Sequence, residues 1–374
     1  MKDKPKVAEF FAGSGLVTEG LRHDFDVVWA NDISIKKKNH YCQNFGEDSF
    51  VLSSISDITG ATVPKVDLVW SSFPCQDLSL AGKMRGMQGT RSGMFWEWLR
   101  VLDELPVAPN VICLENVPGL LSARDGNDYK IIHRELRNRG FAVGSILLDA
   151  LEWVPQSRKR IFIIAVKASL DSSIFQDIEP NWAHPPKLVK VCRELERNIW
   201  WKIPYPENRG KTLSDIIEWD APTFPKDKTE NLLKLLPESH RNTMEEIASI
   251  SKQMVFPGYR RTRNRKQTLE LRFDNISGCL RTAEGGSSRQ FLVIWKSNKW
   301  SSRLLTSREA ARLMGAPDSY KLSEIYNDAY TAMGDAVAVP VVKHLSKHLL
   351  KHLSQNIPTL QNVTTETPKF CLQA

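Results

Sequence analysis

Val7-Ala8-Glu9-Phe10-Phe11-Ala12-Gly13-Ser14-Gly15 is the stretch that decides the fold, because a mostly apolar run ends there in a glycine-rich turn. Residues 7–11 predict a buried strand. The glycines let the backbone approach a ligand at the N-terminus of a following helix, where free N–H groups are exposed. A plain tight turn is the alternative. The turn misses the G-x-G-x-x-G dinucleotide fingerprint, because the next glycine is Gly20. Asp32 could bind ribose hydroxyls at the end of the next strand, so we predict an adenosine-containing ligand.

The same alternation of strand and helix continues outward from this turn to about residue 167. It implies an α/β fold with a mostly parallel sheet and helices on both faces. Sites in such sheets lie at the carboxyl ends of the strands, and the polar residues of interest follow strand candidates. The expected strands cover 7–11, 27–30, 66–70, 111–114, 145–148 and 160–166, and the clearest helices cover 92–105 and 129–139.

The pattern changes after residue 167. Prolines are frequent and periodicity is weaker up to about residue 302, which predicts a smaller, loop-rich second domain. A compact α/β signal then returns. Thr306 and Glu309 have the spacing of a capping box, Gly315 is placed to end that helix, and a last helix is expected over 338–351. The final residues, 353–374, are predicted to form a polar tail.

Composition restricts the class of protein. The 374 residues are 41% hydrophobic and 25% charged, as in a globular chain, and no run reaches the roughly 18 apolar residues of a membrane helix. The N-terminal residues lack a secretory hydrophobic region, so we expect a soluble, intracellular protein. A net charge of +8 favours a polyanionic partner, although an ordinary basic surface is the alternative. The six cysteines are scattered and form no C-x-x-C pair, so neither a disulfide framework nor a zinc site is expected.

Pro74-Cys75-Gln76 presents a thiol in a proline-braced turn after the strand candidate 66–70. Cys75 is a candidate nucleophile, although a buried cysteine that packs as a small hydrophobe is the more common case. Glu115 follows another apolar strand and is expected near the cleft at the sheet edge, unless it only caps a loop.

Gln156, Arg158 and Arg160 alternate in an extended segment, so their side chains should share one face. Solvated charge is the alternative. Three further segments carry donors suited to nucleic acid: a glycine-rich loop over 82–93, a basic run over 259–266 and a loop over 281–290. The first could equally be an ordinary flexible loop, and the second an ordinary basic surface. The candidate side chains are Lys83, Arg85, Arg91, Arg260, Arg261, Arg263, Arg265, Lys266, Arg281, Arg289 and Gln290.

Taken together and in this order, the motifs resemble the DNA cytosine-5 methyltransferase family, the bacterial type II modification methylases. The resemblance covers about residues 7–167 and 303–350. It is carried by FAGSG at 11–15, PCQ at 74–76, ENV at 115–117, Q-x-R-x-R at 156–160, R-x-L-T-x-R-E-x-x-R-L-x-G at 303–315 and GDAV at 334–337.

The resemblance implies a Rossmann-like sheet that binds S-adenosylmethionine and a smaller target-recognition domain. Residues 1–167 would be the catalytic and cofactor-binding domain and 168–302 the recognition domain, with 303–352 returning to the first. The resemblance makes Cys75 the nucleophile, Glu115 the residue that meets N3 of cytosine, and Arg158 and Arg160 the support of a flipped base and its flanking phosphate. Gln76 would contact DNA with the basic candidates above. The implied cofactor contacts are Phe11, Gly13, Ser14, Gly15, Asp32, Ile33, Asp57, Ile58, Pro74, Met94, Asp335 and Ala336.

Some positions depart from the family pattern. Glu9-Phe10 stands where Asp-Leu is usual, Leu16 replaces a glycine, and Asp335 replaces an asparagine. An acid at Asp335 could favour the sulfonium of the cofactor or disfavour a nearby DNA phosphate.

The function expected from the resemblance is methylation of cytosine C5 in a short double-stranded DNA sequence, through a covalent adduct between Cys75 and C6. A monomer acting on DNA is expected, with a cognate restriction endonuclease as a functional rather than a physical partner. A transfer-RNA cytosine methyltransferase is the main alternative. A catalytically silent DNA-binding regulator should lack Cys75 or Glu115, and an NAD dehydrogenase needs the third glycine that is missing here.

Overall fold

The computed structural model describes residues 3–74, 93–207, 209–283 and 288–355. The side chains of its central strands point alternately to two buried faces of the sheet. In β1 (Lys6–Phe10), Val7 packs in one hydrophobic cluster and Ala8 in another. Side chains of β4 (Leu68–Ser71) and β5 (Val111–Asn116) divide between the same two clusters. Because side chains alternate along a strand, this sheet has apolar residues on both faces and must be covered on both.

The large sheet has the order β3-β2-β1-β4-β5-β7-β6-β9-β8. The strands from β3 to β5 in this order are parallel, whereas β7 runs antiparallel to both β5 and β6. This confirms the expected α/β class with a predominantly parallel sheet. The other strands are β2 (Asp26–Asp32), β3 (Phe50–Leu52), β6 (Phe141–Asp149), β7 (Lys159–Lys167), β8 (Gln176–Asp177) and β9 (Asn198–Trp201).

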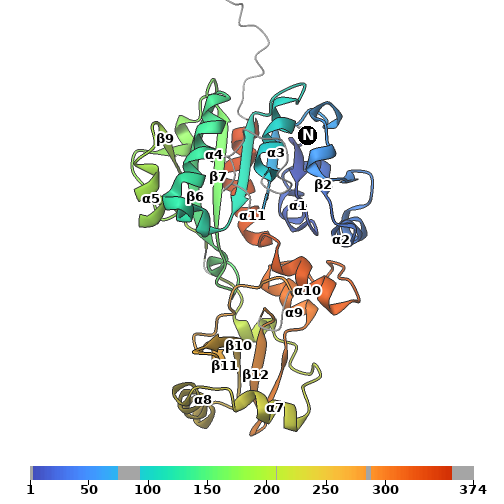
Figure 1. The fold of residues 1–374 in the computed structure, drawn as a ribbon, viewed down its shortest axis with the longest axis vertical. Coiled ribbons are helices and arrows are strands. Elements are labelled where there is room, and N and C mark those ends of the chain that lie inside the picture. The colour runs from blue at the N-terminus through green and yellow to red at the C-terminus, as the bar shows by residue number, and fades with distance from the viewer. Residues whose placement is uncertain (1–2, 75–92, 208, 284–287, 356–374) are drawn as a thin grey trace, which may run out of the picture.

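Helices cover both faces of this sheet (Figure 1). Helices α1 (Leu16–Leu21) and α11 (Val339–Leu345) pack in one cluster, and α3 (Met94–Asp103) and α4 (Asn127–Asn138) pack in the other. Helix α2 (Ile35–Phe45) lies beside β2 and β3. A Cβ on Gly20 of α1 would come within 2.5 Å of Val342, so glycine allows the N-terminal and C-terminal helices to meet. In the described ranges, every helix is too short or too polar to cross a membrane.

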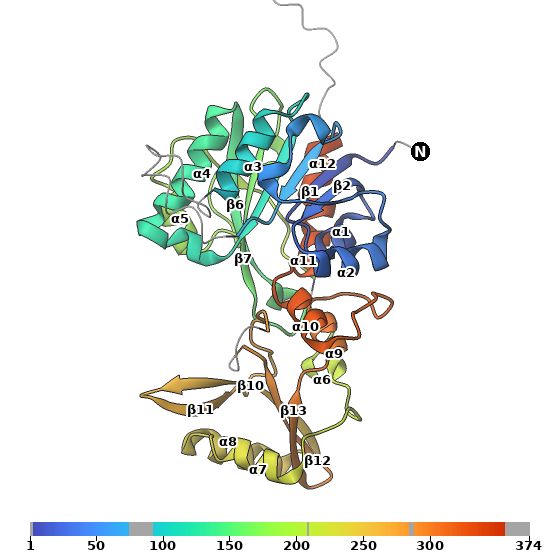
Figure 2. The ribbon, with the colours of Figure 1, turned by 45° about the vertical axis from the view of Figure 1, so that its right-hand side comes forward.

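A smaller lobe lies below the large one (Figures 1 and 2). Its antiparallel sheet has the order β11-β10-β12-β13. Helices α7 (Lys226–Leu233) and α8 (Glu238–Ile250) share a hydrophobic cluster with this sheet. Helices α9 (Ser307–Leu313) and α10 (Tyr326–Gly334) lie between the lobes. The strands are β10 (Gln253–Arg263), β11 (Lys266–Leu271), β12 (Phe291–Lys296) and β13 (Lys299–Leu304).

The structure corrects the expected boundary after residue 167. Strands β8 and β9, and helix α5 (Pro186–Cys192), belong to the large lobe, because β9 pairs with β6. Trp201 is fully buried, and its indole N–H donates to the carbonyl of Ile164 at 3.2 Å. Strands of two and four residues carry little periodic signal, so the sequence pattern does not show that this part of the chain belongs to the large lobe.

The expected start of α9 is confirmed. The Thr306 hydroxyl accepts from the Glu309 N–H at 3.0 Å, and the Glu309 carboxylate accepts from the Thr306 N–H at 2.8 Å. Gly315 follows the helix with φ of +71°, the left-handed conformation that ends many helices. This helix directs the chain back from the small lobe to the large one.

Candidate active site

A cavity of about 580 Å³ opens at the carboxyl ends of β1, β2, β4 and β5. This is where ligands bind in open α/β sheets. The structure brings together at this cavity many residues that are far apart in the sequence. The predicted site residues that line it are Phe11, Gly13, Ser14, Asp32, Ile33, Pro74, Met94, Glu115, Arg160, Asp335 and Ala336.

The turn after β1 has an unusual backbone conformation that leaves one of its faces accessible from the cavity. Phe11 and Gly13 have φ of +57° and +59°. The Asp32 carboxylate accepts from the N–H of Gly13 at 3.0 Å and from the N–H of Ser34 at 2.9 Å. A Cβ on Gly13 would meet no protein atom within 4 Å, so this face of the turn is open to the cavity. Asp32 therefore shapes the turn, a role that the sequence analysis did not assign to it.

Three predicted cofactor contacts lie away from the cavity. A Cβ on Gly15 would come within 2.5 Å of the Phe45 ring, so Gly15 serves packing. Ile58 is buried in the core, where its carbonyl accepts from Arg100 at 3.0 Å, and Asp57 is exposed. The short helical turn Ile55–Asp57 changes the direction of the chain here. The cavity wall is formed instead by Ser53, Ser54 and Ile55.

Glu115 and Arg160 form the polar centre of the deep wall. Arg160 Nε lies 2.9 Å from Glu115 Oε1, and the side chains are only 14% and 9% exposed. The neighbouring Asn116 donates to the carbonyl of Phe73 at 3.1 Å, which ties the end of β5 to the segment after β4. Pro74, at the end of that segment, lines the cavity and directly precedes Cys75 in the sequence. Cys75, Gln76, Lys83, Arg85 and Arg91 lie outside the described residues.

The placement of Arg158 corrects the expectation that it supports a flipped base. Its guanidinium is buried and donates to the carbonyls of Leu280, Gly334 and Ala336 at 2.9, 3.0 and 2.6 Å. Burial and the nearby Arg160 charge lower the pKa of Arg158 to about 10, so it remains charged at neutral pH. Arg158, which directly precedes β7, thus joins this strand to the segment between β11 and β12 and to the C-terminal end of α10.

Gln156 has a similar structural role. Its amide donates to the carbonyl of Leu313 at 2.8 Å, and its side-chain oxygen accepts from the N–H of Leu280 at 3.0 Å. Of the three alternating side chains, only Arg160 lines the cavity. The three side chains therefore do not serve one site: Arg160 faces the cavity, whereas Gln156 and Arg158 connect the two lobes.

Two charged residues of the cavity wall were not predicted as site residues. Glu9 is fully buried, and the Thr18 hydroxyl donates to it at 2.5 Å. Burial raises the pKa of Glu9 to about 8, although the Thr18 hydrogen bond opposes this shift. Lys37 of α2 places its Nζ 2.8 Å from Asp335 Oδ2 and 3.7 Å from Asp32 Oδ2. The departure of Glu9 from the family pattern indicates that this position is unusual. Nothing near Lys37 in the sequence indicates that it pairs with Asp335.

The basic run of the small lobe lies on the β10–β11 hairpin. Arg263 Nε donates to Glu270 Oε1 at 2.7 Å across the hairpin, so one cation of this run is paired with an acid. The sequence alone does not show this pair, because it forms only when the two strands of the hairpin pair in antiparallel register. Arg265 and Lys266 are exposed at the tip, whereas the Arg261 guanidinium lies 4.6 Å from the centroid of the Tyr259 ring.

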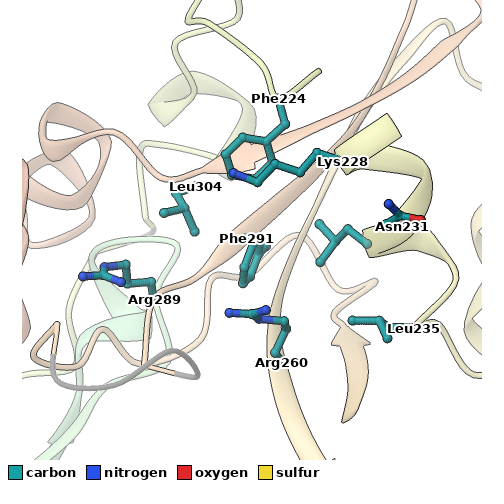
Figure 3. Close-up of a pocket in the computed structure, with 9 residues that line it drawn as sticks. Phe224, Lys228, Asn231, Leu235, Arg260, Arg289, Phe291 and Leu304 are labelled. Atoms are coloured by element: carbon teal, nitrogen blue, oxygen red, sulfur yellow. The ribbon is translucent and has the colours of Figure 1, made fainter. Parts of the chain in front are cut away.

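A second cavity, of about 380 Å³, lies between α7 and the small sheet (Figure 3). Phe224 and Phe291 form apolar walls. Lys228 Nζ lies 3.6 Å from the centroid of Phe224, and the Arg260 guanidinium lies 5.2 Å from that of Phe291. Arg289 also lines this cavity. The described residues that line it include these three cations and no carboxylate, so its charge suits an anion.

Arg281 and Gln290, two of the candidates for contacts with DNA, have different environments in the structure. Arg281 is exposed. Gln290 is fully buried, and its side-chain oxygen accepts from the Ser277 hydroxyl at 2.5 Å. This corrects the expectation that Gln290 reads base edges, because the chain enters the core of the small lobe at this position.

Comparisons with known proteins match this geometry. The family model described as C-5 cytosine-specific DNA methylase matches residues 5–351. The chain is 27% identical over 353 residues to type II methyltransferase M.HaeII of Haemophilus aegyptius, with 91% of each chain covered. It is 27% identical over 350 residues to type II methyltransferase M.Bsp6I of Bacillus sp. (strain RFL6), with 91% of this chain and 97% of that protein covered. The crystal structure of S. pombe Dnmt2 methyltransferase has a similar fold, with a TM-score of 0.60 at 20% identity, over 91% of this chain and 97% of that one. The matches therefore include both lobes.

Proposed function

The chain belongs to the C-5 cytosine-specific DNA methylase family, and from this premise we propose that it methylates C5 of a cytosine flipped out of a short, specific double-stranded DNA sequence. The methyl donor in this proposal is S-adenosylmethionine. The observation that carries the proposal is the Glu115–Arg160 ion pair, which lines the same cavity as the open turn at Gly13. One cavity thus offers a polar wall for a base and a backbone cradle for a cofactor.

The residues of the cavity suit this cofactor. The open face at Gly13 admits a ligand against the backbone, and Asp32 supplies negative charge. When bound, S-adenosylmethionine supplies an electrophilic methyl group on a positively charged sulfur. Phe11, Ser14, Ile33, Pro74, Met94 and Ala336 would complete the walls around it.

The chemistry requires a nucleophile, because C5 of cytosine is a poor carbon nucleophile. In our proposal the Cys75 thiolate bonds to C6, and the electron pair of the C5–C6 double bond becomes available at C5. Glu115, in its protonated form, donates a hydrogen bond or proton to N3, which accepts the charge that develops in the ring. Arg160 holds one oxygen of Glu115. After C5 gains the methyl group, a base removes the C5 proton, the double bond re-forms and the sulfur of Cys75 leaves.

DNA binding is assigned to both lobes. The target atom lies inside the duplex, so the base must be extruded before Cys75 can reach it. We assign contacts with DNA around the extruded base to Gln76, Lys83, Arg85 and Arg91. The recognition of sequence is assigned to the small lobe, whose basic candidates are Arg260, Arg261, Arg263, Arg281 and Arg289. The type II names of the relatives support a role in protecting host DNA from a cognate restriction endonuclease.

The test combines product formation with trapping of the adduct. The protein is incubated with radiolabelled S-adenosylmethionine and duplex DNA, and in parallel with DNA that contains 5-fluorocytosine, from which the C5 substituent cannot leave as a proton. We expect 5-methylcytosine in the first reaction and a covalent protein–DNA adduct in the second. Cys75→Ser should abolish both. A wild-type protein that gives neither product would overturn the proposal, and labelling of transfer RNA in place of duplex DNA would redirect it to that substrate.

A further inference from the structure

Lys37 and Asp335 form an ion pair inside the candidate cofactor cavity. Lys37 is in the first turn of α2, and Asp335 directly follows α10, so the pair joins the two ends of the described chain. The two side chains are 31% and 28% exposed, and both line the cavity. Most surface ion pairs contribute little, but a pair in a cavity wall sets the charge that a ligand meets there.

The other charged residues that line the cavity, among those that the structure describes, are Glu9, Asp32, Glu115 and Arg160. Asp32 carries one further negative charge, whose oxygens already accept from two backbone N–H groups. Glu115 and Arg160 neutralise each other. Glu9 is largely protonated at neutral pH, because its pKa is raised to about 8, mainly by burial. With Lys37 balancing Asp335, the lining formed by the residues that the structure describes retains a single negative charge, that of Asp32.

We propose that Lys37 is a positioning residue that holds and neutralises Asp335, so that the cavity matches the single positive charge of a sulfonium cofactor. This inference rests on the proposed function, since it assumes that the cavity binds S-adenosylmethionine. It assigns to Asp335 a charge balanced by Lys37 rather than a free carboxylate. The two residues should therefore act as a unit, so that changing either one alone shifts the preference between charged and neutral ligands, whereas changing both leaves it close to that of wild type.

The test compares binding of two ligands that differ in charge at sulfur. S-adenosylmethionine carries a sulfonium, whereas S-adenosylhomocysteine has a neutral thioether. Their dissociation constants are measured by calorimetry without DNA for wild type, Lys37→Met, Asp335→Asn and the double variant. The ratio of the two constants isolates the effect of charge, because a change in cavity shape alone should affect both ligands in the same direction.

The expected shifts have opposite signs. Asp335→Asn leaves Lys37 to balance Asp32, so the described lining loses its net negative charge, and the preference for S-adenosylmethionine should fall by roughly fivefold. Lys37→Met leaves two carboxylates and should increase that preference by a similar factor. The double variant keeps the net charge of wild type and should return the ratio close to the wild-type value, as expected for coupled neighbours.

The controls separate the possible failures. Lys38→Met removes the same charge from the same helix, but Lys38 does not line the cavity, so the ratio should stay at the wild-type value. Lys37→Gln repeats the main change with a polar side chain in case the Met variant fails to fold. Parallel changes in both constants, or an unchanged ratio in folded variants, would overturn the role of Lys37. Wild-type protein that binds neither ligand would instead overturn the proposed function.

Discussion

Glu115 and Arg160 meet because β5 and β7 are antiparallel neighbours, in a sheet that is otherwise mostly parallel. Residues near the end of β5 therefore face residues near the start of β7. A carboxylate with one oxygen fixed by a guanidinium has one oxygen left to meet a ligand. The local motif indicates a glutamate near a cleft, whereas the reversed strand supplies its partner.

Replacing Glu115 by Gln tests its role at N3 of the base. The amide keeps the size of the side chain but cannot act as an acid, so we expect methylation to fall by roughly 10²- to 10⁴-fold. Binding of S-adenosylmethionine should change little. Single-turnover methylation and calorimetry measure the two effects. Equal losses in turnover and in cofactor affinity would show that Glu115 serves the cofactor half of the cavity instead.

The buried Glu9 predicts a dependence of stability on pH. Burial raises its pKa from 4.5 to about 8 in the folded protein, against the opposing Thr18 hydrogen bond. Between these values the folded state holds a proton that the unfolded chain has released. The free energy of unfolding should therefore fall as pH rises through this window, and level off above it.

Glu9→Gln should remove this contribution. We expect the fall in unfolding free energy between about pH 5 and 8 to be smaller in the variant, by roughly a few kcal/mol in total. Urea unfolding at several pH values measures the difference. Glu179→Gln, at an exposed position, is the control and should follow wild type. Parallel profiles for wild type and Glu9→Gln would show that Glu9 titrates normally.

At the scale of elements, strong local patterns were enough to predict much of the fold. The apolar runs gave strands β1, β2, β4, β5, β6 and β7 to within a few residues, and the capping box gave the start of α9. The short strands β8 and β9 were missed because their place depends on pairing with β6 rather than on their own pattern.

The candidate site shows the same division. The turn at Gly13 and the ends of β4 and β5 were predicted from local sequence, and their residues do line one cavity. The pairs Lys37–Asp335 and Arg263–Glu270 could not be predicted from local sequence. The first forms only when distant segments of the chain meet, and the second only when the two strands of a hairpin pair.

Arg158 connects three elements, so its replacement should act on stability. Arg158→Met leaves the carbonyls of Leu280, Gly334 and Ala336 without this donor in a buried site. We expect a loss of about 3 kcal/mol or more in unfolding free energy. Urea unfolding measures it. Arg160→Met is the matched control and should lose activity with less effect on stability. A stable Arg158→Met protein that fails to bind DNA would restore the base-supporting role expected from the sequence.

At the scale of the whole molecule, the two lobes divide the chemistry. The large lobe holds the cavity with Glu115 and Arg160, and the small lobe presents cations on β10 and around the second cavity (Figures 1 and 3). A phosphate contact releases counterions from DNA, so each one steepens the dependence of affinity on salt. The salt dependence can therefore count the small-lobe cations that touch the backbone.

The hairpin offers a matched pair for this measurement. Arg260 lies in the wall of the second cavity, whereas Arg263 forms an ion pair with Glu270. If Arg260 contacts a phosphate, Arg260→Met should reduce the slope of log affinity against log salt by about 0.9 and weaken cognate and unrelated duplexes alike. Arg263→Met should change the slope less, because Arg263 would have to leave Glu270 before it could contact a phosphate. Slopes from DNA titrations at several salt concentrations decide between them. An equal reduction by both variants would mean that Glu270 releases Arg263 when DNA binds.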